Sequence, residues 1–143
     1  FQPSVHAALG MADRVGILTV LPDVAAMQRR LVHAQGLAER VTDLRVIDVP
    51  VLGVHEHDIV LDRLAEEAES AIAAGTATGF VLGCTGMIGL AADLSQRLSD
   101  KHGHVPVVDP TGAAITALEQ AVRLGIGPSR LDYFPPRSKR RSA

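Results

Sequence analysis

A chain of 143 residues, 47% hydrophobic and 21% charged, has the size and composition of one globular domain with a core of its own. The net charge of −2 gives no basis for a nucleic-acid partner, and no apolar run approaches the ~20 residues that span a membrane. The single cysteine, Cys84, cannot form an internal disulfide, so we expect a reducing compartment such as the cytoplasm.

The first predicted elements are a short helix, a strand and a second helix. Residues 4–12 carry apolar side chains at helical spacing, and because this helix starts so near Phe1 we expect sequence to precede it in a longer protein. Residues 14–20 are β-branched and apolar on both faces, which predicts a central parallel strand. Asp23 is the expected N-cap of a helix over residues 24–35. The inner face of that helix is predicted to consist of Met27, Leu31 and Ala34.

The rest of the chain repeats the alternation of strands and helices. Strands are predicted at residues 44–49, 80–83 and 105–108, and helices at residues 58–74, 87–100 and 112–124. The apolar residues expected on the inner faces of these helices are Leu61, Leu64, Ala65, Ala68 and Ile72, then Ile88, Ala91, Ala92, Leu94 and Leu98, then Ile115, Leu118 and Val122. Asp109 stands before Pro110, an order typical of a helix start.

Four strands that alternate with helices predict an α/β fold of three layers, with a four-stranded parallel sheet in the flavodoxin-like order 2-1-3-4. This order places the first and third strands side by side, so that Thr19 and Cys84 meet at the carboxyl edge of the sheet, where open α/β sheets bind ligands. We expect one domain over residues 1–125, in which residues 1–13 end a connecting helix. Residues 126–143 are expected to form an irregular basic tail.

The segment Gly83-Cys84-Thr85-Gly86 is the first candidate for chemistry. Its glycines let a ligand approach the backbone closely. The N–H groups of Thr85, Gly86 and Met87 are expected to be free donors at a helix N-terminus, where they hold an anion and favour a thiolate. A lone cysteine at a tight turn is more often a small buried apolar side chain. The motif by itself leaves both interpretations open.

A second candidate is the end of the first strand, where Thr19, Val20 and Leu21 would present a hydroxyl and two amides to the same edge of the sheet. Taken alone, Thr19 is an ordinary β-branched residue at the end of a strand. His55 and His57 lie two residues apart in a loop, but no third ligand has a suitable spacing. We therefore interpret both histidines as solvated and expect no metal site.

Four segments, in this order, resemble the second half of the aspartate/glutamate/hydantoin racemase superfamily, and in particular its hydantoin and allantoin racemase branch. They are Val15-Gly16-Ile17-Leu18-Thr19-Val20-Leu21-Pro22, Val81-Leu82-Gly83-Cys84-Thr85-Gly86-Met87, Val105-Pro106-Val107-Val108-Asp109-Pro110 and Ser129-Arg130-Leu131-Asp132-Tyr133-Phe134-Pro135-Pro136. The resemblance spans nearly the whole chain, and the segment around Cys84 is the most specific of the four.

The resemblance implies two α/β domains that enclose a cyclic ureide or amino-acid derivative, each with one cysteine. One thiolate removes the α-proton and the other thiol delivers a proton to the opposite face, without a cofactor. It implies that Cys84 is the second-domain cysteine, and that Gly83, Thr85 and Gly86 form part of an anion or amide site. Thr19-Val20-Leu21 would form the other substrate loop. The first domain has no counterpart in these residues, so we expect the 143 residues alone to have little or no racemase activity.

Two other functions stay open at this point. An enzyme similar to arylmalonate decarboxylases would protonate an enolate from one cysteine and would need only Cys84. A non-catalytic binding module would use the face that meets the other domain in the family, and we expect such a face to be apolar and to make the chain a homo-oligomer.

Overall fold

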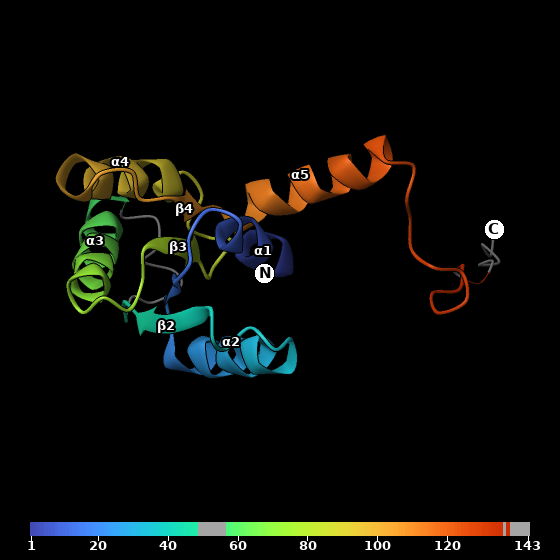
Figure 1. Ribbon diagram of the computed structural model, residues 1–143, viewed down its shortest axis with the longest axis horizontal. Coiled ribbons are helices and arrows are strands. Elements are labelled where there is room, and N and C mark those ends of the chain that lie inside the picture. Colours follow the sequence, from blue (N-terminus) through green and yellow to red (C-terminus); the bar gives the residue numbers. More distant parts are fainter. Residues whose placement is uncertain (49–56, 136, 138–143) are drawn as a thin grey trace, which may run out of the picture.

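The computed structural model describes residues 1–48, 57–135 and 137. In these residues helices and strands alternate as predicted (Figure 1). The elements are α1 (Gln2–Leu9), β1 (Val15–Thr19), α2 (Pro22–Ala34), β2 (Val41–Val46), α3 (His57–Ala73), β3 (Gly79–Leu82), α4 (Leu90–His102), β4 (Val107–Val108) and α5 (Pro110–Arg123). The four strands form one parallel sheet in the order β2-β1-β3-β4, which confirms the predicted topology.

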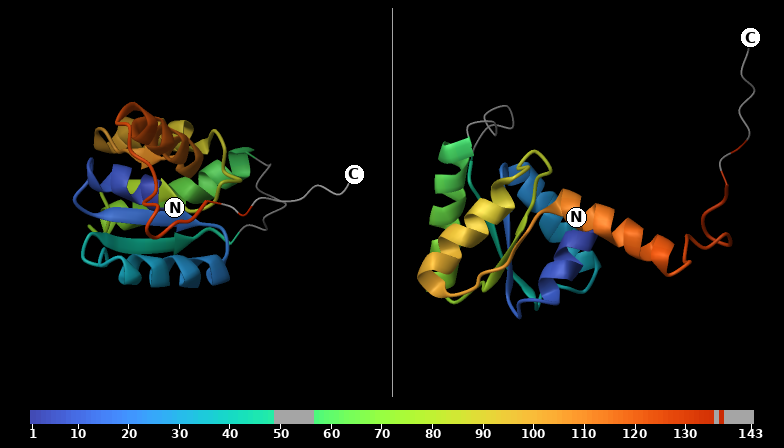
Figure 2. Two further views of the ribbon diagram at one scale, coloured as in Figure 1. Left: turned by 90° about the vertical axis from the view of Figure 1, so that its right-hand side faces the viewer. Right: turned by 90° about the horizontal axis from the view of Figure 1, so that it is seen from above.

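The sheet is the middle of three layers, with α1 and α2 on one face and α3 and α4 on the other (Figure 2). Side chains of a strand point alternately to the two faces. On β1, Ile17 packs into the apolar cluster beneath α1 and α2, while Leu18 packs into the cluster beneath α3 and α4. On β3, Val81 and Leu82 divide in the same way. Both central strands are therefore buried on both sides.

The layer between the sheet and α3 packs so closely that β1 requires a glycine. A Cβ atom added at Gly16 would lie 2.8 Å from two ring carbons of Phe80 and 3.1 Å from the Cβ atom of Ala77. Phe80 is fully buried on the neighbouring strand β3. Phe80 is the one buried aromatic residue among those described, and its ring fills the space that a side chain at residue 16 would need.

The helix α2 differs from the prediction in its start and in its buried face. It begins at Pro22, with Leu21 as the N-cap, so Asp23 is in the first turn and not the cap. Proline suits this position because its ring presets φ and its missing N–H would have no helical partner. The buried residues are Ala25, Gln28 and Val32. The predicted residues Met27 and Leu31 are 48% and 38% exposed, and Ala34 is also exposed.

Several other boundaries also shift. The second strand lies at Val41–Val46 and not at residues 44–49, and β4 is reduced to Val107–Val108. The helix α4 begins at Leu90, three residues later than predicted, with Gly89 in the left-handed region at φ 85° as its N-cap. Consequently Ile88 is 72% exposed, outside the helix. The buried residues of α4 are Leu90, Ala91, Leu94 and Leu98, whereas Ala92 is exposed.

The last helix, α5, starts as predicted: the carboxylate of Asp109 accepts a hydrogen bond from the Thr111 N–H at 2.7 Å. Its apolar residues Ile115, Leu118 and Val122 are not buried, since 55%, 69% and 79% of their surfaces are exposed. Figure 2 shows α5 extending away from the three layers. From Leu124 to Pro135 the described residues form turns without helix or strand. A domain limit at residue 125 stays a prediction.

Within the described ranges, the chain has no helix of the length and apolar character needed to cross a membrane.

Candidate functional site

The cysteine lies directly beyond the carboxyl end of β3, next to the carboxyl end of β1. The N–H of Gly83 donates to the Leu18 carbonyl at 2.7 Å, which extends the β1–β3 pairing by one residue beyond Leu82. A turn over residues 84–89 then leads into α4. The sequence prediction that Thr19 and Cys84 end neighbouring strands at one edge of the sheet agrees with this arrangement.

The Cys84 side chain is half-buried and packs against the apolar cluster beneath α3 and α4. Its Sγ atom accepts a hydrogen bond from the Gly86 N–H at 3.4 Å. The carbonyl of Cys84 accepts from the Met87 N–H at 3.3 Å. Hydrogen bonds to a sulfur favour its charged form, so the turn itself supplies a donor for a thiolate. Thr85 and Gly86 beside it are exposed.

Of the three donors predicted for this turn, only the Thr85 N–H has no acceptor among the described residues. Because α4 begins at Leu90, the N–H groups of residues 85–87 are not at a helix N-terminus. Those of Gly86 and Met87 are used inside the turn, by the sulfur and by the carbonyl of Cys84. Among the residues that the structure describes, none accepts a hydrogen bond from the N–H of Cys84 or Thr85. These two are the backbone donors that a ligand could use.

Thr19 is brought beside Gly83 and not beside the thiol. Its side chain is fully buried on the α2 side of the sheet, and its Oγ1 atom has no hydrogen-bond partner in the described part of the chain. A Cβ atom at Gly83 would lie 3.0 Å from the Cβ atom of Thr19. Gly83 thus lacks a side chain because of the packing below it. That Gly83 also lets a ligand approach the backbone stays a prediction.

The other two residues predicted for the substrate loop, Val20 and Leu21, contribute to the core and to the start of α2. Val20 is buried in the cluster beneath α3 and α4. Leu21 is half-buried and caps α2, where its carbonyl accepts from the Ala25 N–H at 3.0 Å. A contact of either residue with a substrate stays a prediction.

Gln28 of α2 is the residue that sequence reasoning missed. It is 2% exposed, and its Nε2 atom donates to the Gly83 carbonyl at 2.7 Å. A Cβ atom at Gly83 would lie 2.7 Å from Nε2 and 2.9 Å from Oε1 of Gln28. The sequence contains a signal that could have found Gln28. It follows Ala25 by three residues and precedes Val32 by four, so the three residues share one face, or stripe, of the helix. A long polar side chain in such a stripe indicates a buried hydrogen-bond partner.

The start of α3 is held close to the start of α4 by a contact between His57 and Asp93. The Nε2 atom of His57 lies 3.0 Å from Oδ2 of Asp93, and both side chains are about half exposed. His57 is thus the first residue of a helix with a carboxylate partner, whereas a solvated loop was predicted. His55 lies outside the described residues. In the described ranges, no three His, Cys, Asp or Glu side chains gather as a metal site.

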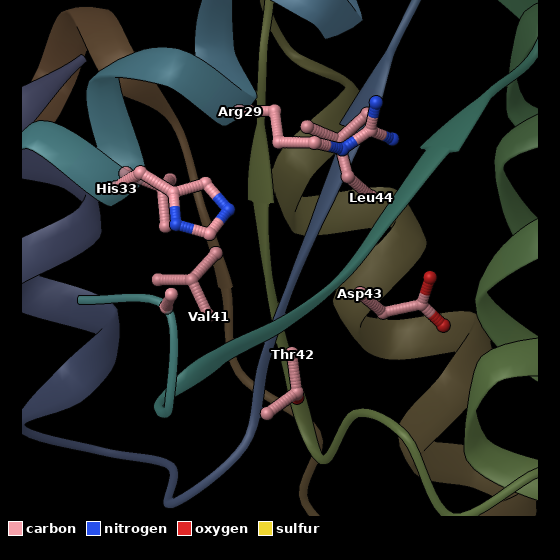
Figure 3. A pocket seen from close by; sticks show the side chains of 8 residues that line it. Arg29, His33, Val41, Thr42, Asp43 and Leu44 are labelled. Atoms are coloured by element: carbon pink, nitrogen blue, oxygen red, sulfur yellow. The ribbon is translucent and has the colours of Figure 1, made fainter.

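Two cavities lie away from the cysteine. One, of about 370 Å³, is on the outer side of the sheet, where Arg29 and His33 project from α2 beside β2 (Figure 3). The other is a groove of about 900 Å³ between α1, β4 and α5, bordered by Val107 and Asp109. Neither is lined by Cys84 or its turn.

The fold and the position of the thiol define an open parallel α/β domain with a cysteine at the carboxyl edge of its sheet, the edge at which open α/β sheets generally bind ligands. The chain belongs to the Asp/Glu/hydantoin racemase family, whose sequence profile matches residues 1–118. It is 31% identical over 134 residues to a hydantoin racemase of Paenarthrobacter aurescens, covering 93% of this chain and 55% of that protein. With a hydantoin racemase of Rhizobium meliloti the identity is 34% over 140 residues, 96% of this chain and 56% of the relative.

Two solved structures of allantoin racemases are also similar to this chain. An allantoin racemase from Klebsiella pneumoniae superposes with a TM-score of 0.83 at 31% identity, over 99% of this chain and 56% of the other. An allantoin racemase from Pseudomonas fluorescens gives a TM-score of 0.84 at 29% identity, over 99% of this chain and 59% of the other. The chain therefore spans little more than half the length of the relatives that it matches.

Proposed function

We propose that this chain is the part of a hydantoin-type racemase that carries one of two thiol bases, Cys84. The observation that carries the proposal is the half-buried thiol at the carboxyl edge of a racemase-family sheet, with the Gly86 N–H donating to its sulfur. A thiolate in that position can act as a base toward a carbon next to a carbonyl group. The substrate class is a cyclic ureide or an amino-acid derivative; the relatives that support it are named hydantoin racemase and allantoin racemase.

In the proposed step, the Cys84 thiolate takes the α-proton of the substrate. The C–H bond breaks, an S–H bond forms, and the electron pair moves onto the adjacent carbonyl oxygen. The N–H groups of Cys84 and Thr85, which have no acceptor among the described residues, are available to stabilise that oxygen. Inversion is completed when a second acid delivers a proton to the opposite face.

We propose that the second acid–base group comes from a part of the family chain that these 143 residues do not span. The relatives are nearly twice as long, since the matched region is 55% of one hydantoin racemase. The described residues offer no second thiol, because Cys84 is the only cysteine of the sequence. The chemistry proposed here transfers protons and requires no electron acceptor. A thiol kept reduced for this purpose fits the cytoplasm.

The test uses each enantiomer of a 5-substituted hydantoin in D₂O, with spontaneous exchange subtracted. We expect the 143-residue chain to exchange the α-proton of one enantiomer with retention, faster than the Cys84→Ser variant, and to produce no inverted product. Equal exchange by both proteins would contradict the role of Cys84. Inversion that depends on Cys84 would contradict the need for a second group outside the chain.

A one-thiol enzyme is the second candidate, favoured by the single cysteine of the sequence. In a decarboxylase similar to those that act on aryl malonates, loss of CO₂ leaves an enolate that the Cys84 thiol protonates. Stereospecific, Cys84-dependent decarboxylation of an aryl malonate by the 143-residue chain would favour this candidate over the racemase.

A non-catalytic association module is the third candidate, favoured by the exposed apolar residues of α5. Leu118 is 69% exposed and lies on a helix that extends from the layered body. If α5 mediates self-association into a homo-oligomer, Leu118→Glu lowers the sedimentation coefficient at micromolar concentration. The matched control is Met11→Glu, at a side chain that is 74% exposed outside α5.

A further inference from the structure

Gln28 is an unusual residue for the place it occupies. It lies in the buried stripe of α2 between Ala25 and Val32, where an aliphatic side chain would pack without any polar group to satisfy. Its Nε2 atom reaches the Gly83 carbonyl, 55 residues later in the chain, at 2.7 Å. Its Oε1 atom is buried without a partner among the described residues. A buried amide that is half unsatisfied costs stability, so the bond to Gly83 is the feature that distinguishes it from leucine or methionine.

We propose that Gln28 is a positioning residue that fixes the peptide between Gly83 and Cys84 and thereby aims the Cys84 N–H. A peptide bond is planar and trans, so its carbonyl and its N–H point in opposite directions. Because Gln28 holds the carbonyl of Gly83 toward α2, the N–H of Cys84 points away from α2. On that side no described residue accepts its hydrogen.

The consequence for chemistry rests on the proposed function. A donor with a fixed direction can meet the oxygen on which negative charge develops, without reorganising during the reaction. The same constraint acts on the thiol, because the turn that places the Gly86 N–H on the sulfur starts at this peptide. Without Gln28, the peptide is free to rotate, and both the Cys84 N–H and the hydrogen bond to the sulfur lose their fixed geometry.

A direct test observes this peptide by NMR. Because the chain has one cysteine, labelling glycine with ¹³C at the carbonyl and cysteine with ¹⁵N leaves a single Gly–Cys peptide to detect, that of Gly83 and Cys84. We expect Gln28→Met, which keeps the length of the side chain, to move the carbonyl signal upfield and to broaden the amide signal.

The second readout is the pH dependence of Cys84 alkylation by iodoacetamide, which requires no racemase activity. For Gln28→Met, in which the donor to the sulfur is no longer held in place, we expect alkylation at neutral pH to slow about threefold. The control is Ser95→Ala, which removes another buried side-chain bond to a carbonyl, 2.7 Å long, between Ser95 and Val105. Circular dichroism identifies the temperature at which all variants are folded.

An unchanged carbonyl signal in folded Gln28→Met would overturn the proposal, and so would an alkylation profile that moves no more than that of Ser95→Ala. Failure of the proposed racemase function leaves a different pattern. In that case no substrate exchange depends on Cys84, while both Gln28 readouts still change.

Discussion

Replacing Thr19 by valine should stabilise the protein, although a hydroxyl at the edge of a candidate site suggests the opposite. Thr19 has no exposed surface, and its Oγ1 atom has no hydrogen-bond partner among the described residues. A buried hydroxyl without a partner carries a desolvation penalty of about 1–3 kcal/mol. Valine has the same branched shape and puts a methyl group in its place, worth up to ~0.8 kcal/mol of apolar burial.

Taking the lower end of the penalty, we expect the free energy of unfolding to rise by about 1–2 kcal/mol. For a chain of this size that corresponds to an increase of about 3–6 °C in the melting temperature. Urea denaturation followed by circular dichroism measures the change directly, as a shift of the midpoint at constant slope. The same variant tests whether the Thr19 hydroxyl contacts a substrate. If the hydroxyl makes no such contact, Thr19→Val binds the substrate as well as the unmodified chain does.

The matched control is Thr76→Val, the same substitution at a hydroxyl that is used. Thr76 donates to Oδ2 of Asp43, and the same hydroxyl lies 3.1 Å from the Ala71 carbonyl. We expect this variant to lose about 1–2 kcal/mol. If Thr19→Val is destabilised by 1 kcal/mol or more, Oγ1 has a partner and the reasoning about this buried edge is refuted.

Three further predictions concern packing, pH and helix capping. Gly16→Ala should cost about 1–3 kcal/mol in urea unfolding, because the new Cβ atom lies 2.8 Å from the Phe80 ring, and Phe80→Leu in the same chain should recover part of the loss. The hydrogen bond from Lys101 lowers the pKa of Glu69. The pair therefore stabilises the fold at pH values above the usual pKa of a carboxylate, and this stabilisation is lost as the pH falls through the lowered pKa. Stability measured from pH 6 to pH 3 should therefore fall less steeply in Lys101→Ala, and an identical pH dependence would contradict the pairing. Asp109→Ala removes the cap of α5 and should cost about 1 kcal/mol of local helix stability, visible as faster amide exchange in the first turn.

The topology was predictable because it depends on local patterns. Runs of β-branched residues such as residues 15–20 alternate with helical segments, and this alternation restricts the fold to a parallel sheet with right-handed crossovers. The position of Cys84 followed from the same pattern, since a strand that ends in Gly83 must turn there. These inferences require no knowledge of which distant residues meet.

The predictions were wrong where a residue far away in the sequence determines which side chains are buried. Met27, Leu31 and Ala34 have helical spacing, as do Ala25, Gln28 and Val32. Hydrophobicity favours the first set, which is the one that the structure exposes. The second set is buried against the sheet, where Val32 joins the apolar cluster and Gln28 reaches the Gly83 carbonyl, 55 residues away. Sequence periodicity has no access to that contact.

A similar cause displaced the start of α4. Met87 was predicted as its first residue, but its side chain is 1% exposed and fills the core beneath α3 and α4. Gly89 then takes a left-handed conformation and starts the helix only at Leu90. The predicted anion site on residues 85–87 depended on the earlier start; of its three donors Thr85 is still available, and the N–H of Cys84 takes the place of those of Gly86 and Met87. Tertiary packing of one methionine thus changed which amides can serve a ligand.

The alternation of side chains at the end of β3 has a consequence for laboratory evolution of this domain. Gly83 faces α2 and Cys84 faces α3 and α4, so two consecutive residues contact different helical layers of the fold. Randomising α2 around Gln28 would vary the direction of the backbone donor and, through the turn, the hydrogen bond from Gly86 to the sulfur, while the apolar side chains beside the sulfur stay constant. Randomising α4 around Leu90 would vary the surroundings of the sulfur while the peptide stays anchored. Two small libraries can therefore be screened separately, and their best members then have to be measured in combination, because both sets of changes act on the same thiol.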